Sequence, residues 1–180
     1  PIEVFGAATK KKAFSSYEVV VISVAKNKTV RSEEGLRIIA DKTIYDDIKL
    51  DVLLVPSAYE MDKFLNNLDL INYIKKQNKS ASWLASNCSG ALLLAKAGVL
   101  DGKKATTWAG GEKELLKSYP KIKVQFDKNV VIDDRVITSN GGPVSYQAAF
   151  KLLAKLSSNN FAKEISELIQ FNRLERAFKP

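Results

Sequence analysis

Histidine is absent from the 180-residue sequence, and cysteine occurs only once. A single cysteine excludes an internal disulfide, and the absence of histidine removes the commonest metal ligand and the commonest general base near neutral pH. Any proton transfer would therefore use carboxylates, tyrosine, lysine, the thiol or water. The sequence also lacks a glycine-rich phosphate-binding motif and a set of residues with metal-ligand spacing, so we expect neither a metal nor an organic cofactor.

Long apolar runs are missing as well. No run approaches the roughly 20 residues that span a bilayer, and the first ten residues do not have the pattern of a secretory signal. We therefore expect a soluble, cytoplasmic protein without a membrane partner. Hydrophobic residues make up 46% of the chain, which is enough for one compact domain with a substantial core. We expect that single domain to extend over residues 1–180.

Acidic residues are outnumbered, with 20 Asp and Glu against 28 Lys and Arg and a formal net charge of +8. Clustered basic residues bind phosphates by releasing counterions, which would favour a nucleic-acid partner. Here, however, the basic residues are spread along the chain, and most are interleaved with acids or stand at expected helix ends. Solvated helix and loop surfaces explain this distribution better, so we do not expect a nucleic-acid partner.

Short apolar runs alternate with segments of helical periodicity. We expect buried strands at 17–24, 51–56 and 80–86, because near-continuous apolar runs are typical of a parallel sheet covered on both faces. Apolar residues at helical spacing predict one amphipathic helix over 60–77, and a further helix is expected over 89–98, closed by a glycine. This alternation predicts an α/β, flavodoxin-like, three-layer sandwich with a mostly parallel central sheet.

The remaining segments complete this pattern. We expect short strands around a turn at Glu34 and Gly35, strands near 103–106, 122–125, 129–132 and 135–138, and helices near 112–118, 144–158 and 161–174. Asp133 and Asp134 are expected to form a hairpin turn and not a catalytic acid pair, because Asp is a favoured turn residue.

The only cysteine, Cys88, lies in the segment SNCSG, where an expected strand meets an expected helix. A strand that turns abruptly into a helix exposes the residue at the turn and crowds its backbone, and the small residues Ser86 and Gly90 would relieve that crowding. Such a nucleophile elbow would stabilise a thiolate and offer N–H donors to a developing oxyanion. The alternative is a small apolar core residue, since free cysteine is often buried. The local pattern leaves both interpretations open.

A wider resemblance adds to this pattern. The segment ASNCSGALLLAKAGVLDGKKATTW, 85–108, resembles the nucleophile-elbow segment of the DJ-1/PfpI superfamily, which has the class I glutamine amidotransferase-like fold. It is most similar to the isonitrile hydratase-like branch. The segments PIEVFGAA, DVLLVP and VITSNGGPVSYQAAFKLLAKL resemble, in order, the first helix, a strand and a later strand with its helix. The resemblance covers essentially the whole chain.

The resemblance implies a cysteine-dependent enzyme for a small-molecule substrate, without a cofactor. Cys88 would attack an electrophilic carbon, Ser89 would donate its backbone N–H to an oxyanion, and water would release the adduct. A homodimer is the family expectation. The positions that would line the substrate site are Ser57, Ala58, Thr107, Trp108 and Gly141.

Three departures from the family pattern bear on this expectation. Trp108 stands where the family usually has histidine, and Ser57 and Ala58 stand where it usually has two glycines. The family's first strand carries an acidic residue that contacts the cysteine, but this sequence begins after that position, so the family's first strand is absent from it. Either the sequence is a fragment whose first strand precedes Pro1, or the protein lacks this strand and is a degenerate member of the family. We expect the first, with the acidic partner of Cys88 upstream of Pro1. Glu3 is the alternative candidate for this partner, but in this resemblance it belongs to the first helix, so we expect it to face away from the elbow.

Two other functions remain open at this point. Cys88 would oxidise reversibly in a non-catalytic stress or redox-sensing protein. Alternatively, the chain would be the ligand-binding domain of a transcriptional regulator, although residues 161–180 resemble the closing helix and tail of stand-alone hydratases. The sequence does not identify the substrate.

Overall fold

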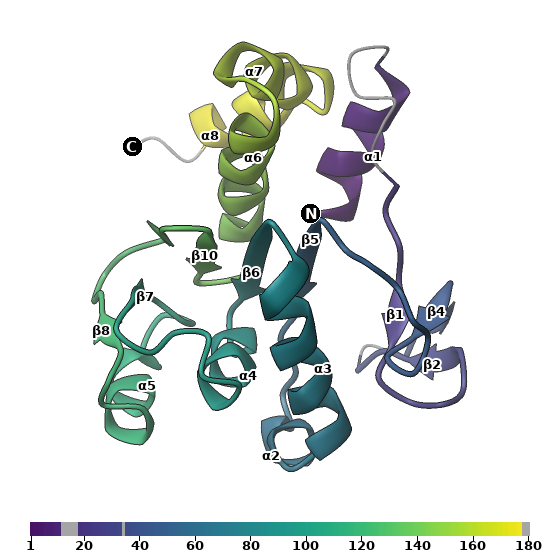
Figure 1. Ribbon diagram of the computed structural model, residues 1–180. Helices are drawn as coiled ribbons and strands as arrows, with labels where there is room; N and C mark the ends of the chain where they lie inside the picture. Colours follow the sequence, from purple (N-terminus) through teal and green to yellow (C-terminus); the bar gives the residue numbers. More distant parts are fainter. Residues whose placement is uncertain (12–17, 34, 178–180) are drawn as a thin grey trace. The chain divides into compact units, whose positions relative to one another are not determined.

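The computed structural model describes residues 1–11, 18–33 and 35–177 (Figure 1). The chain divides into two compact units, which we call the terminal unit, residues 1–19 with 145–180, and the middle unit, residues 20–144. The single domain expected over residues 1–180 stays a prediction. In the part of the chain that the structure describes, no helix is long and apolar enough to cross a membrane.

The main sheet of the middle unit has the strand order β5-β6-β10-β9. Its strands are β5 (Val52–Val55), β6 (Trp83–Asn87), β9 (Val130–Asp133) and β10 (Val136–Ser139). β6 is parallel to both β5 and β10, while β9 and β10 form an antiparallel hairpin whose turn contains Asp134 at φ 54°. The predicted α/β fold with a mostly parallel sheet and the hairpin turn are confirmed, and the three-layer arrangement stays a prediction.

The other strands in the described residues form three two-stranded sheets. They pair β1 (Ile22–Ser23) with β4 (Lys42–Thr43), β2 (Thr29–Arg31) with β3 (Arg37–Ile39), and β7 (Lys104–Ala105) with β8 (Lys123–Val124). Only the β2–β3 pair is antiparallel, and Gly35 lies at φ 90° in its connection. The short strands expected around this turn are confirmed, although Glu34 itself lies outside the described residues.

The expected buried strand 17–24 is wrong in its extent. Only Ile22 and Ser23 form a strand, Val19 is exposed, and Tyr17 lies outside the described residues. The backbone N–H of Val21 donates instead to the Asp41 carboxylate at 2.8 Å. A buried strand needs hydrogen-bond partners along both edges, and the described residues supply β1 with β4 alone.

The helices of the middle unit are α2 (Met61–Leu65), α3 (Leu68–Ser80), α4 (Gly90–Lys96) and α5 (Glu112–Ser118). The single helix expected over 60–77 is therefore wrong, because the chain breaks between α2 and α3. The side chain of Asn67 accepts a hydrogen bond from the Leu70 N–H at 3.1 Å and so caps a new helix. An N-cap of this kind is available to any asparagine, and apolar periodicity does not reveal it.

The core of the middle unit forms where β6 and α4 meet. Leu84, Leu94, Leu100 and Leu115 are completely buried in one apolar cluster. α4 alone contributes Ala91 to Ala95 to this cluster, as expected for an element with few exposed positions, and β6 contributes Leu84. This packing anchors both segments that flank Cys88.

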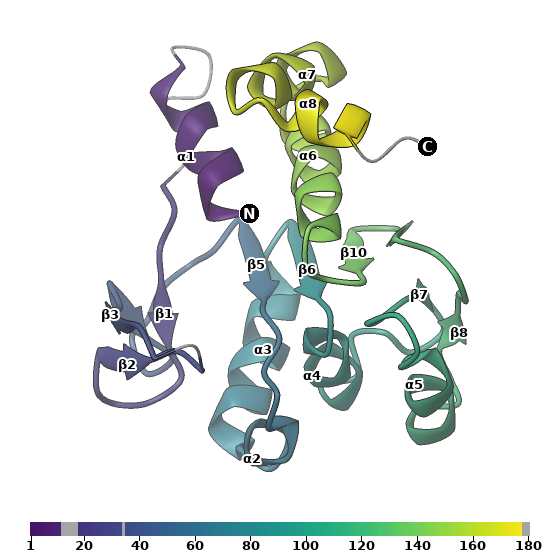
Figure 2. The same cartoon turned by 180° about the vertical axis from the view of Figure 1, so that it is seen from behind.

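The terminal unit is helical. It contains α1 (Ile2–Lys10), α6 (Val144–Leu156), α7 (Asn159–Leu168) and α8 (Phe171–Ala177), and Figure 2 shows α6 beside α7 and α8. Val4 and Leu153 are fully buried in its core. The single helix expected over 161–174 is wrong, because the chain ends α7 and reverses at Gln170, which has φ 61°.

The start of α4 lies against the end of β5, and this contact requires glycine. A Cβ atom added to Gly90 would lie 2.4 Å from the Val55 carbonyl oxygen and 2.7 Å from that of Pro56. Gly6, inside α1, is a matched control, because a Cβ added there meets no atom within 4 Å.

We expect Gly90→Ala to lower the free energy of unfolding by about 3 kcal/mol, because backbone atoms must move to admit the methyl group. Gly6→Ala should raise it by up to about 1 kcal/mol through helix propensity. Urea denaturation followed by circular dichroism measures both changes. An unchanged denaturation midpoint for Gly90→Ala would contradict the close approach of α4 to β5.

Candidate functional site

Cys88 lies at the carboxyl end of β6, between that strand and α4, as the sequence predicts. Its backbone has φ 54°, a left-handed conformation that is uncommon for residues other than glycine. The Cys88 N–H donates to the Ser139 carbonyl at 2.8 Å and so extends the pairing of β6 with β10. Cys88 is a free cysteine, and the residue is partly exposed. Ligands of α/β proteins bind at this carboxyl edge of the sheet.

Two polar side chains hold the backbone of Cys88 in place. The buried Thr107 hydroxyl donates to the Cys88 carbonyl at 3.0 Å, and the Asn140 amide donates to the Thr107 carbonyl at 2.6 Å. Three segments that are far apart in the sequence therefore meet at one point. Thr107 is among the predicted site residues, whereas Asn140 is not. Its place directly after β10, the parallel neighbour of β6, is the signal that puts it beside Cys88.

Gly141 lies directly against the thiol. It has φ 100°, and a Cβ atom added to it would lie 2.6 Å from the Cys88 Cβ and 3.4 Å from the sulfur atom. Glycine is therefore required here for its backbone conformation and for the space it leaves. The structure brings this predicted site residue into contact with Cys88.

Ser89 connects Cys88 to the turn after β5. Its hydroxyl donates to the Ala58 carbonyl at 3.0 Å and accepts from the Ala58 N–H at 3.3 Å. The Ala58 N–H, one of the donors that a Gly-Gly turn would present, therefore points at Ser89. The role of the Ser89 N–H in stabilising an oxyanion stays a prediction.

The other two predicted site residues have separate surroundings. Ser57 is exposed at the surface. Trp108 is half-buried and packs against the core of the middle unit, and its ring covers Gly111, where an added Cβ atom would lie 2.1 Å from a ring carbon. That Ser57 and Trp108 line a substrate site stays a prediction.

The carboxylate of Glu3 has a partner within the terminal unit. It accepts a hydrogen bond from the Tyr146 hydroxyl, and this bond raises the pKa of Tyr146 above its usual value. In the part of the chain that the structure describes, no group of three or more His, Cys, Asp or Glu side chains could hold a metal ion.

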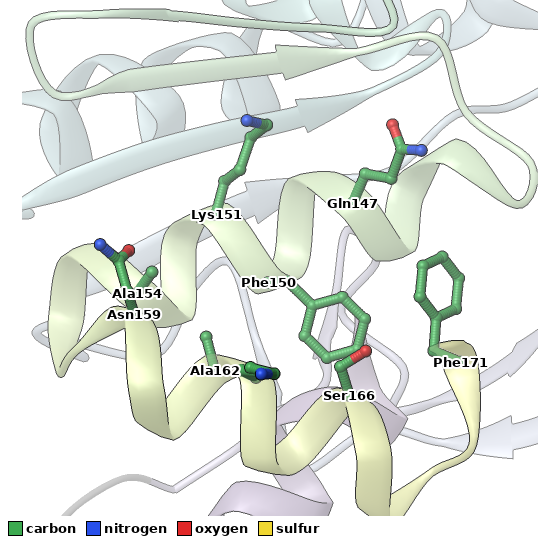
Figure 3. Close-up of a pocket in the computed structure, with 9 residues that line it drawn as sticks. Gln147, Phe150, Lys151, Ala154, Asn159, Ala162, Ser166 and Phe171 are labelled. Atoms are coloured by element: carbon green, nitrogen blue, oxygen red, sulfur yellow. The ribbon is translucent and has the colours of Figure 1, made fainter. Parts of the chain in front are cut away.

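The terminal unit also contains an open groove of about 450 Å³ between α6, α7 and α8. Figure 3 shows Phe150 and Phe171 at this groove, with Ser166 beside them and Lys151 above. None of the predicted site residues lines it.

The fold and the position of Cys88 define an α/β protein with a free thiol at the carboxyl edge of a parallel sheet. The chain belongs to the DJ-1/PfpI family, whose sequence model matches residues 1–155. The predicted family is thereby confirmed.

Relatives in distant organisms support this membership. The chain is 24% identical to protein dj-1beta of Drosophila melanogaster over 160 residues, covering 86% of this chain and 84% of that protein. The crystal structure of the same fly protein matches with a TM-score of 0.79 at 22% identity, covering 93% of this chain and 87% of that one. An uncharacterized protein of Methanocaldococcus jannaschii is 30% identical over 148 residues, covering 79% of this chain and 70% of that protein.

The isonitrile hydratase of Pseudomonas putida is 29% identical over 143 residues, covering 79% of this chain and 61% of the hydratase. Its identity is similar to that of the other relatives. The comparison therefore supports the family but does not single out the hydratase-like branch.

The contact between Gly141 and the thiol predicts a change in Cys88 reactivity. We expect Gly141→Ala to slow alkylation of Cys88 by iodoacetamide by about tenfold or more, because the new methyl group displaces the cysteine side chain. Gly142→Ala is the control, since Gly142 also has positive φ, at 54°, but an added Cβ there meets no atom within 4 Å. Equal alkylation rates in the two variants would contradict the contact.

The two bonds of the Ser89 hydroxyl predict a cost in stability. Ser89→Ala should lower the free energy of unfolding by about 1 to 2 kcal/mol, because it leaves the Ala58 backbone groups without their partner. Ser86 is a matched control, since its buried hydroxyl has no hydrogen-bond partner among the described residues. Ser86→Ala should therefore be neutral or stabilising. Urea denaturation of both variants checks this, and similar losses in the two would count against a linking role for Ser89.

Proposed function

We propose that this protein is a cysteine-dependent enzyme that adds water to a small electrophilic substrate through a covalent adduct on Cys88. The observation that carries the proposal is the placement of a partly exposed cysteine on a left-handed backbone at the carboxyl end of β6. Strained backbone conformations of this kind cluster at functional sites. We interpret this junction as a nucleophile elbow.

The surroundings of Cys88 support this role. The Thr107 hydroxyl binds its carbonyl, and Gly141 lies against its side chain, so both contacts position the sulfur. A nucleophile that is held in place loses less freedom on reaching the transition state. We assign to the Ser89 backbone N–H the stabilisation of negative charge on the adduct.

An isonitrile illustrates the reaction. The Cys88 thiolate forms a bond to the terminal carbon, which takes a proton and becomes a thioimidate. Water then adds across the C=N bond, with its oxygen to the carbon and one of its protons to the nitrogen. The C–S bond breaks as the carbonyl forms, the thiolate leaves, and the hydroxyl proton is released, which replaces the proton taken up in the first step. The product is an N-substituted formamide, whose oxygen and N–H proton come from the added water. The thiolate is regenerated.

The names of two relatives support a small electrophile as substrate. One is the isonitrile hydratase of Pseudomonas putida, and the other is the glutathione-independent glyoxalase DJR-1.2 of Caenorhabditis elegans, 25% identical over 139 residues. Isonitriles and α-oxoaldehydes both present an electrophilic carbon to a thiolate. We therefore place the substrate in one of these two classes.

Reversible oxidation of Cys88 is the second candidate function, and the partly exposed free cysteine favours it. An accessible thiol is open to peroxide as well as to a carbon electrophile. One relative, of Bacillus subtilis, is named general stress protein 18 and is 28% identical over 134 residues. Turnover of substrate separates the two candidates.

We expect the purified protein to hydrate cyclohexyl isonitrile or consume methylglyoxal, and Cys88→Ala to lower that rate by about a thousandfold or more, as loss of a nucleophile does. Chromatography of the formamide or lactate product measures the rate. Cys88→Ser is the matched variant, since it keeps the shape of the side chain but replaces the thiol by a poorer nucleophile.

Equal turnover by the wild-type protein and Cys88→Ala would overturn the proposal. So would the absence of turnover of both substrates by the wild-type protein. In that second case, addition of oxygen to Cys88 by mild peroxide and its reversal by a thiol, both followed by mass spectrometry, would support the redox function instead.

A further inference from the structure

We infer that Glu33 is a positioning residue for the Cys88 site and that it acts through the turn that follows β5. The inference rests on the proposed function, because it concerns the reactivity of the same thiol. It assigns a role to an acidic residue of the β2–β3 connection, a segment that the sequence patterns do not associate with chemistry.

The Glu33 carboxylate reaches across to the turn after β5. Its two oxygen atoms lie 2.8 and 3.0 Å from the backbone nitrogen of Tyr59, which donates to them. Figure 2 shows the β2–β3 hairpin and the coil between β5 and α2, the two segments that this contact joins. A hydrogen bond from a backbone N–H to a carboxylate is charge-assisted and stronger than a neutral one.

The next residue of the turn leads directly to the thiol. Ala58 precedes Tyr59, and both of its backbone polar groups bind the Ser89 hydroxyl. Ser89 in turn follows Cys88. Two consecutive residues of the turn are therefore held, one by Ser89 from the α4 side and one by Glu33 from the hairpin.

The turn depends on these bonds because local geometry does not hold it. The usual Gly-Gly pair is replaced by Ser57 and Ala58, and neither residue is in a positive-φ conformation. The Tyr59 side chain is 87% exposed, so packing does not hold that residue either. Ala58 packs against the core of the middle unit, and hydrogen bonds to Glu33 and Ser89 fix the backbone of the turn on either side of that contact.

The Glu33 carboxylate binds the Tyr59 N–H without a competing ion pair in the part of the chain that the structure describes. Within the described residues its carboxylate forms no ion pair, in contrast to Glu60, which pairs with Lys63 at 3.4 Å. Loss of the Glu33 carboxylate would release the Tyr59 N–H and loosen the hold on Ala58. The contact of Ala58 with the Ser89 hydroxyl would then break more often, which would leave the segment beside Cys88 less restrained and its thiol more reactive.

The test uses the fact that Cys88 is the only cysteine, so that alkylation of the protein reports on this thiol alone. We expect Glu33→Ala to raise the rate constant for alkylation of Cys88 by iodoacetamide by about three- to fivefold, the range that loss of one exposed charged contact supports. Glu33→Gln should give a rate nearer to wild type, because its amide oxygen still accepts from the Tyr59 N–H. Glu60→Gln is the control and should react as wild type.

Equal alkylation rates for the wild-type protein, Glu33→Ala and Glu60→Gln would overturn the inference. A faster rate accompanied by a lower urea midpoint, with no rescue by Glu33→Gln, would also overturn it, since it would indicate general loosening of the fold. Alkylation requires no turnover, so failure of the enzyme assay with a Glu33 effect on alkylation would remove the proposed function alone. Turnover by the wild-type protein without a Glu33 effect would remove this inference alone.

Discussion

The left-handed backbone of Cys88 is the constraint on which the rest of the site depends. This conformation turns the chain sharply from β6 into α4, and the turn fits only because glycine stands on each side of it. Gly90 lets α4 begin against the end of β5, and Gly141 lets the loop after β10 approach the thiol. The two close approaches hold the strained residue between three strands of one sheet, which supplies the packing energy that such strain requires.

Polar side chains complete the arrangement at the carboxyl edge of that sheet. Thr107, Asn140 and Ser89 use their side chains on the backbone groups of neighbouring loops and not on one another. Burial of these groups costs little because each finds a partner, and each bond joins two segments that the sheet alone does not join. The result is a fixed thiol with loops ordered around it, and Glu33 extends the same principle to the β2–β3 hairpin.

The sequence predicted most elements because their apolar patterns are strong and local. β5, β6, α4 and α5 were expected within three residues of their observed bounds, since each is a short apolar or helical segment bounded by turn residues. The two helix predictions that were wrong failed because a single residue ends a helix inside a continuous apolar pattern. An asparagine cap divides α2 from α3, and a left-handed residue, Gln170, divides α7 from α8. Neither the cap nor the left-handed residue changes the spacing of the apolar residues, so the apolar pattern does not reveal either of them.

The sequence alone determined the α/β order, the family resemblance and the position of Cys88 between a strand and a helix, because all three follow from contiguous residues. Only the tertiary structure decided which residues meet at the thiol. Gly141 reaches Cys88 because it follows β10, which pairs with β6 in a particular register. Thr107 reaches the Cys88 carbonyl from the segment after β7, and Glu33 reaches the neighbouring turn from a separate hairpin. Contacts of this kind depend on strand order and loop geometry, and the local preferences of the residues involved do not specify them.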